Sequence, residues 1–267
     1  AGIQDSETWC RPPSEPGMGR YYEVGKRLLT EEVNAAVAGF FEAGAAEIVV
    51  ADGHGAGGID PLLLDERVRL LRGWPTGWPL ELDVSFHAVA WAGQHAKAGT
   101  PYAHLAHTQS FRYVDQSING LSVGEFGQFA LCAGEMGIPA IFCSGDEAFC
   151  YEARTLAPEI VTVAVKRGLT PGTGEDLDTA AYARRNLAAE HLHPAAARRL
   201  IRAGARQALG ALRANGPEGL LVRLEPPFER VTRFRGATAG EPQTLDRAQH
   251  ALSVAAVLNE PFRPAPV

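Results

Sequence analysis

The stretch that decides the fold is EIVVADGHGAGG, residues 47–58. Its first part, residues 47–51, is a short apolar run of the length typical of a buried strand. Residues 21–45 in front of it place apolar side chains at helical spacing, which predicts an amphipathic helix. A helix that leads directly into a buried strand is typical of a parallel α/β sheet. The glycine-rich loop that follows carries His54.

The same arrangement occurs a second time along the chain. A predicted strand at residues 84–90 runs into the loop GQHAKAGTP, residues 93–101, which carries His95. Ligands of open α/β sheets bind at the carboxyl ends of the strands. We therefore expect His54 and His95 to lie at the same edge of the sheet.

Further elements follow in an order that suits such a sheet. Apolar runs between turn signals predict strands at residues 111–118, 140–144 and 160–165, and helices at residues 122–135 and 147–156. Glu125 lies in the first turn of the first of these two helices, close to the chain segment that carries the histidines.

Beyond Gly168 the composition changes, first to Gly, Thr and Asp and then to Ala and Arg. The patterns there predict helices at residues 194–214 and 245–258 and short strands at residues 220–224 and 231–234. We predict an α/β fold with a three-layer, mostly parallel sheet and a smaller C-terminal α+β unit. The predicted domains are residues 1–168 and residues 169–267.

Composition excludes several kinds of partner. The 267 residues carry a formal net charge of −6, which offers no basic surface to a phosphate backbone, so we expect no nucleic acid. No apolar run approaches the ~18 residues that a membrane-spanning helix needs, so we expect no membrane partner. The four cysteines form no C-x-x-C pair, which favours a reducing, cytoplasmic compartment.

Four of the eight histidines fall in loops rather than on periodic faces, namely His54, His95, His104 and His107. A single loop histidine is most often hydrogen-bonded for structural reasons, but a group of them favours a site. Two imidazoles and a carboxylate on successive loops form a ligand set that suits catalytic zinc, which can activate water for attack on an amide carbonyl. His107 is the first candidate for acid/base or nucleophilic chemistry, and His104 is its competitor.

Other catalytic patterns are absent from the sequence. Ser110, Ser122 and Ser144 lack the G-x-S-x-G environment of a serine hydrolase nucleophile. The glycines after His54 complete neither the P-loop pattern nor G-x-G-x-x-G, so nucleotide binding is disfavoured.

Taken together, four motifs resemble the D-aminopeptidase family, the DppA-like zinc aminopeptidases of peptidase family M55. They are DGHG at residues 52–55, GQHAKAGTP at 93–101, AHT at 106–108 and GE at 124–125. The resemblance implies that His54, His95 and Glu125 are metal ligands and that His107 is catalytic. Residues 1–168 would then be the metal-binding catalytic domain.

The start of the chain departs from the family pattern. The family opens with a strand that ends in D-x-E-G, and its Asp and Glu complete a two-zinc centre, whereas Ala1-Gly2-Ile3 resembles the residues that follow this motif. We therefore expect two zinc ions where those ligands are present, and a functional protein with further N-terminal residues that contain them.

The expected function is a zinc-dependent aminopeptidase that hydrolyses the N-terminal residue, including a D-amino acid, from short peptides through a two-metal centre. The resemblance also implies a ring-like homo-oligomer, with a decamer as one form. Two alternatives stay open. One is a catalytically impaired homologue that binds peptides or metal, and the other is a metal-dependent amidase that acts on non-peptide substrates.

Overall fold

The computed structural model describes residues 22–54, 57–73 and 76–266. Several residues used in the sequence analysis lie outside the described part. They are residues 1–3, Cys10, Tyr21, and Gly55 and Ala56 in the loop after His54.

The first described helix, α2 (Tyr22–Glu42), leads into strand β1 (Val49–Ala51), as the sequence predicts. Strand β1 pairs in parallel with β2 (Arg69–Leu71). Val33 and Val37 of the helix are buried against a small apolar cluster that includes side chains of both strands. This packing explains why apolar residues recur along one face of the helix.

A second sheet has the strand order β3-β6-β7-β8. Its strands are β3 (Val89–Gln94), β6 (Ala140–Asp146), β7 (Val161–Gly168) and β8 (Ala189–His191), of which the first three are parallel and the last is antiparallel. All seven residues of β6 are buried. A strand that is buried along its whole length is expected where helices cover both faces of a sheet.

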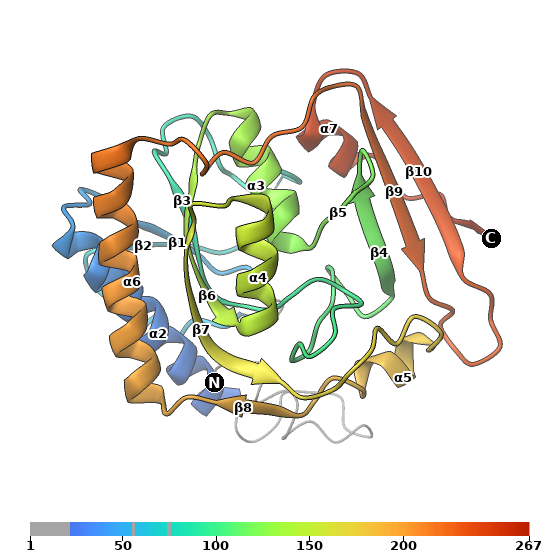
Figure 1. Cartoon of the computed structure of the whole chain (residues 1–267), viewed down its shortest axis with the longest axis horizontal. Coiled ribbons are helices and arrows are strands. Elements are labelled where there is room, and N and C mark those ends of the chain that lie inside the picture. The colour runs from blue at the N-terminus through green and yellow to red at the C-terminus, as the bar shows by residue number, and fades with distance from the viewer. Residues whose placement is uncertain (1–21, 55–56, 74–75, 267) are drawn as a thin grey trace.

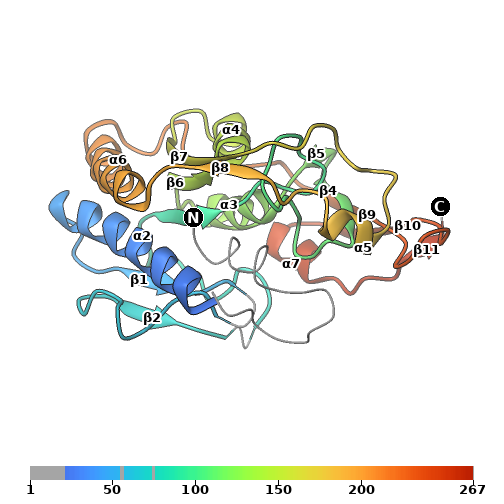
Figure 2. The same cartoon turned by 90° about the horizontal axis from the view of Figure 1, so that it is seen from below.

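Helices do cover both faces. Figure 1 shows α2 and α6 (Pro194–Asn215) on one side of the parallel strands, with α3 (Glu125–Glu135) and α4 (Glu147–Leu156) on the other. The view in Figure 2 shows the same layers from below. The main apolar core lies between these layers and includes Phe126, Phe142, Phe149 and Ile201. The expectation of an α/β fold with helices on both sides of a largely parallel sheet is confirmed.

A third sheet is antiparallel and has the order β11-β10-β9-β4-β5. Its strands are β4 (Tyr113–Ile118), β5 (Leu121–Ser122), β9 (Phe228–Phe234), β10 (Thr244–His250) and β11 (Ala265–Pro266). Two short helices, α5 (Thr179–Ala183) and α7 (Val254–Asn259), lie beside it (Figure 1).

A buried arginine joins two strands of this sheet to α7. Arg230 of β9 is fully buried and forms an ion pair of 2.8 Å with Asp246 of β10. Its guanidinium also donates hydrogen bonds to the carbonyl oxygens of Val257, Leu258 and Glu260 at the end of α7. The charge is therefore satisfied by a carboxylate and by helix-end carbonyls, as a buried guanidinium requires.

Three sequence-based element assignments were wrong. The helix predicted at residues 245–258 is strand β10 followed by the short helix α7, because seven residue pairs with β9 stabilise an extended backbone there. The strand predicted at residues 84–90 begins only at Val89, where pairing with β6 starts. Residues 220–224 form no strand in the described structure.

Two contacts span the predicted domain boundary near Gly168. Helix α2 packs along α6, and β4 pairs with β9 over residues Tyr113 to Ile118. The division into residues 1–168 and 169–267 stays a prediction. Among the described residues, no helix combines the length and the apolar character that crossing a bilayer requires.

Candidate metal centre

Three chain segments meet at the carboxyl end of strand β3. The strand ends at Gln94, opposite Gly145 of β6, and His95 follows it directly. Glu125 is the first residue of α3. His107 lies in the segment between them. Its backbone N–H donates a hydrogen bond to the carbonyl oxygen of Ala96, the residue after His95.

The side chains of His95, His107 and Glu125 offer ligand atoms that all lie within 4.8 Å of one another. The Nε2 atom of His95 is 3.4 Å from Oε2 of Glu125, and Nε2 of His107 is 3.8 Å from Oε1. The two imidazole rings are stacked, with centroids 3.9 Å apart and planes at 24°. Both rings therefore present the same nitrogen to one carboxylate.

The other ring nitrogen of each histidine contacts a backbone carbonyl. Nδ1 of His95 lies 3.0 Å from the oxygen of Ala96, and Nδ1 of His107 lies 2.7 Å from the oxygen of Leu105. A carbonyl accepts only from a protonated nitrogen, so in the neutral rings the lone pair is on Nε2, facing Glu125. Metal-ligating histidines are oriented in this way. These residues thus fit a zinc ion, which takes nitrogen and oxygen donors.

Glu125 is held by two donors before any metal binds. The side-chain amide of Gln94 donates to its Oε2 at 3.0 Å, and the backbone N–H of Gln109 donates to its Oε1 at 2.9 Å. Its position at the start of α3 also suits a negative charge, because the helix dipole is positive there. Both carboxylate oxygens are therefore fixed in direction.

The charges in the cluster shift each other's pKa. Burial raises the pKa of the Glu125 carboxyl, but His95, His107 and the Gln94 amide stabilise the anion and bring that pKa well below its ordinary value. Burial lowers the pKa of the His95 ring, but the Glu125 carboxylate outweighs this and raises it above its ordinary value. In the absence of metal, the arrangement therefore favours an ion pair.

His54, which the sequence places among the ligands, is not part of this three-residue group in the described structure. It follows β1, and its backbone N–H contacts the Asp52 carboxylate at 3.4 Å. That carboxylate is almost fully buried and accepts from the backbone of Gly58 and from the Arg72 guanidinium. Asp52 thus organises the loop that carries His54.

His104, the competitor of His107, lies elsewhere. It is fully buried, with its Nδ1 atom 3.3 Å from Nζ of Lys166 and its ring edge-on to His191. Its backbone N–H donates to the carboxylate of Asp146 at 3.0 Å. Among the described residues, only His107 of the two joins the group around Glu125.

No sequence pattern points to Gln94 or Gln109, which hold the Glu125 carboxylate. Gln94 could have been suspected from its place directly before His95. Gln109 acts through its backbone, and a backbone donor has no residue signature.

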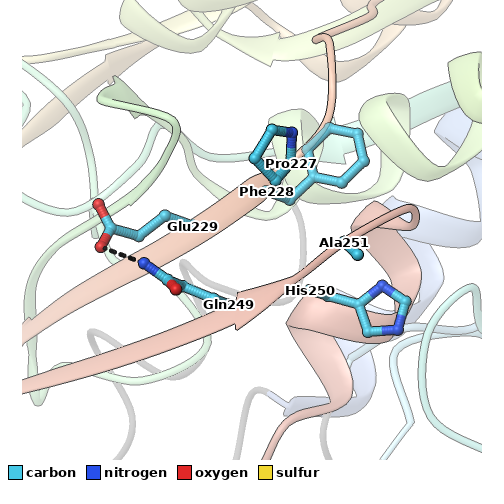
Figure 3. Close-up of a pocket in the computed structure, with 6 residues that line it drawn as sticks. All are labelled: Pro227, Phe228, Glu229, Gln249, His250 and Ala251. Atoms are coloured by element: carbon cyan, nitrogen blue, oxygen red, sulfur yellow. Dashed lines mark hydrogen bonds between the residues drawn. The ribbon is translucent and has the colours of Figure 1, made fainter.

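A hollow in the surface lies where strand β9 begins and strand β10 ends, near α7 (Figure 3). It shares no residue with the candidate metal-ligand group of His95, His107 and Glu125, and it is lined by Pro227, Phe228, Glu229, Gln249, His250 and Ala251. Nδ1 of His250 accepts hydrogen bonds from the backbone of Leu252 and Ser253, so this imidazole is used at the start of α7.

Comparison with known proteins gives three findings. The sequence model of peptidase family M55, described as D-aminopeptidase, matches residues 10–244. A D-aminopeptidase of Bacillus subtilis (strain 168) is 32% identical over 156 residues, which are 57% of this chain and 56% of that protein. The match thus spans a little over half the length of that relative.

The third finding concerns the fold. The structure is similar to that of the Zn-dependent D-aminopeptidase DppA from Bacillus subtilis, with a TM-score of 0.74 and 24% sequence identity. The similarity covers 90% of this chain and 86% of that one. That protein is described as a self-compartmentalizing protease.

Proposed function

This chain belongs to the D-aminopeptidase family, and on that premise we propose that it is a zinc-dependent aminopeptidase. It removes the N-terminal residue, including a D-amino acid, from short peptides. The observation that carries this proposal is the convergence of His95, His107 and Glu125 within 4.8 Å, with both Nε2 atoms facing the carboxylate. The similarity to a D-aminopeptidase of Bacillus subtilis supports the choice of this substrate class.

His95 and Glu125 would hold a zinc ion in this proposal. Zinc, when bound, polarises a scissile carbonyl and lowers the pKa of water. Gln94 and the Gln109 backbone, which donate hydrogen bonds to the Glu125 carboxylate, would keep it in place as a ligand. Nδ1 of His107 stays bonded to the Leu105 carbonyl, so that Nε2 is the atom that accepts or delivers a proton beside the substrate.

A second zinc position is the finer part of the proposal. His54 would contribute to it, because it follows the carboxyl end of β1 as His95 follows that of β3. In the family pattern, an Asp and a Glu complete the two-zinc centre, and this second position would likewise need carboxylate ligands besides His54. Two zinc ions per chain in the wild type and one in His54→Ala would support it, whereas equal zinc contents would exclude a ligand role for His54.

Assembly and location complete the proposal. We place the protein in a ring-like homo-oligomer, with a decamer as one form, on the analogy of the self-compartmentalizing relative. Light scattering of the purified protein measures its mass directly. The described cysteines Cys132, Cys143 and Cys150 are free and buried, which suits the reducing cytoplasm.

A substrate comparison tests the activity. The purified chain, loaded with zinc, is assayed on D- and L-alanine p-nitroanilides, on dipeptides of both chiralities and on a non-peptide amide. Release of an N-terminal residue that stops on chelation and returns with zinc supports the aminopeptidase. Hydrolysis of the non-peptide amide alone would favour an amidase, and zinc binding without any hydrolysis would favour a binding protein.

A matched histidine variant controls for unspecific effects. His87 is exposed on the surface and is not a member of the metal-ligand group. His87→Ala should retain the wild-type rate, whereas His95→Ala should lose both zinc and turnover. An equal loss in both variants would contradict the proposed centre.

A further inference from the structure

A series of hydrogen-bonded side chains begins at Gln109, an exposed residue beside the candidate metal centre, and continues into the protein interior. The side-chain amide of Gln109 donates to Oε1 of Gln128 at 2.9 Å, and Gln128 in turn donates to Oε1 of Gln116. Gln116 then donates to the hydroxyl of Thr232 at 2.9 Å. Gln128, Gln116 and Thr232 are at most 2% exposed. A buried amide is costly unless its hydrogen bonds are satisfied, so the two buried glutamines depend on the partners at either side of them.

The members come from four parts of the fold. Gln128 lies on α3, three residues after Glu125, so both side chains project from the same face of the helix. Gln116 on β4 lies directly opposite Thr232 on β9. The series therefore connects the third sheet, through α3, to the segment that carries His107.

Gln109 is the end of the series that reaches the centre. Its backbone has φ +58°, in the left-handed region that non-glycine residues rarely adopt. In this conformation its N–H donates to Oε1 of Glu125 at 2.9 Å. Its side chain meanwhile is bonded to Gln128, so one residue bridges Glu125 and Gln128 on the same helix face.

We infer that Gln128 and Gln116 are positioning residues for the metal centre. They anchor the Gln109 side chain, and this anchor holds the left-handed turn whose N–H fixes the Glu125 carboxylate. The inference rests on the proposed function in taking Glu125 as a metal ligand. Partners that orient a ligand carboxylate typically change metal affinity by 10- to 100-fold when they are removed.

The test uses Gln128→Met, which keeps the volume of the buried side chain and removes its amide. Two quantities are measured on the full chain. One is the exchange rate of the Gln109 backbone amide by NMR in the metal-free protein, and the other is the zinc dissociation constant by competition with a chelator. We expect faster exchange and a zinc affinity lower by roughly 10-fold.

A rescue separates positioning from packing. Glycine adopts the left-handed conformation without steric strain, so Gln109→Gly added to Gln128→Met should restore most of the zinc affinity. Gln109→Ala added to Gln128→Met should not. Gln243→Met, which removes a surface amide bonded to the Glu175 carbonyl, serves as the control and should leave both quantities unchanged.

The outcomes distinguish this inference from the proposed function. Unchanged amide exchange or unchanged zinc affinity in Gln128→Met overturns the positioning role, and so does equal affinity of the glycine and alanine double variants. If the wild type binds zinc but cleaves no peptide, the proposed function fails, while the affinities still decide the inference. If the wild type binds no zinc, the exchange rate of the Gln109 backbone amide in Gln128→Met still decides whether Gln128 holds this turn.

Discussion

His95 and His107 reach the same carboxylate, but they are held by different surroundings. The His95 side chain is 5% exposed, whereas that of His107 is 20% exposed and packs against the ring of Phe111. A ligand benefits from enclosure, and a group that exchanges protons with a substrate needs access. The difference in exposure supports the assignment of His95 to the metal and of His107 to proton transfer.

Substitution of the two histidines should therefore give different results. His95→Ala should lower the zinc content, because it removes a ligand atom. His107→Ala should lower turnover by roughly 10²- to 10⁴-fold while the zinc content stays at the wild-type value. Metal analysis and rate measurements on the same preparations check this. Zinc loss in His107→Ala would instead make His107 a third ligand.

The pH dependence of stability should reverse when zinc binds. Without metal, the raised pKa of His95 means that its ion pair with Glu125 stabilises the fold below the ordinary value of 6.5 and is lost as pH rises through the raised pKa. Zinc requires the neutral ring, so the zinc-bound protein should gain stability over the same rise in pH. Thermal melts between about pH 6 and pH 8, with and without zinc, measure both slopes. Parallel slopes would contradict the prediction.

For the candidate site, the sequence predicted the central residues well and the residues that support them poorly. His95, His107 and Glu125 were all singled out from loop position and motif resemblance, and the structure brings them together. The grouping of His54 with them and the separate role of His107 stay predictions. The supporting glutamines could not be predicted, because amides are common on protein surfaces and the roles of these ones depend on contacts between distant segments.

The start of α3 has little room for a larger residue. It packs closely against the loop that follows His95, because Gly124 leaves room for Lys97. A Cβ atom at Gly124 would lie 2.7 Å from Cβ of Lys97 and 3.0 Å from its Cα. The loop is also tied to α4, where Glu152 accepts a hydrogen bond from the Lys97 backbone at 2.9 Å.

Gly124→Ala should therefore push the start of α3 away from this loop. We expect a loss of about 1–3 kcal/mol in the free energy of unfolding and weaker zinc binding, because Glu125 moves with the helix start. Gly210→Ala is the matched control, since a Cβ atom on this α6 residue meets nothing within 4 Å. That variant should be neutral or more stable by up to about 1 kcal/mol. Denaturant unfolding and zinc titration compare the two, and similar losses would refute the explanation.

Elements with strong local patterns were predictable, and those fixed by distant partners were not. Helix α6 and the buried strand β6 match the predictions within a few residues, because apolar spacing determines both. The sequence of strand β10, TLDRAQH, has no clear strand alternation, which is why the pattern predicts a helix there. Its extended form comes from pairing with β9, where the buried Asp246 carboxylate is satisfied by the Arg230 guanidinium and by the backbone N–H of Arg263.

For the molecule as a whole, contacts across residue 168 predict cooperative unfolding. Helix α2 packs on α6, β4 pairs with β9, and the series of hydrogen-bonded side chains links that sheet to the metal centre. We expect a single calorimetric transition rather than two, and an upward shift with zinc. Zinc at about 100 times its dissociation constant should add roughly 2.7 kcal/mol to the free energy of unfolding. Two transitions, only one of which responds to zinc, would favour independent domains.

The β4–β9 pairing also has a consequence for synthesis on the ribosome. Gln116 and its partner Thr232 are 116 residues apart in the sequence, so at ordinary translation rates β4 emerges on the order of ten seconds before β9. During that interval one edge of β4 is open, which is the kind of surface that nascent chains aggregate through and that chaperones protect. His95, His107 and Glu125 have all emerged by then, but the strand that anchors their support has not. A nascent chain stalled before β9 would thus expose the side chains of His95, His107 and Glu125 without the rigidity to retain a metal tightly.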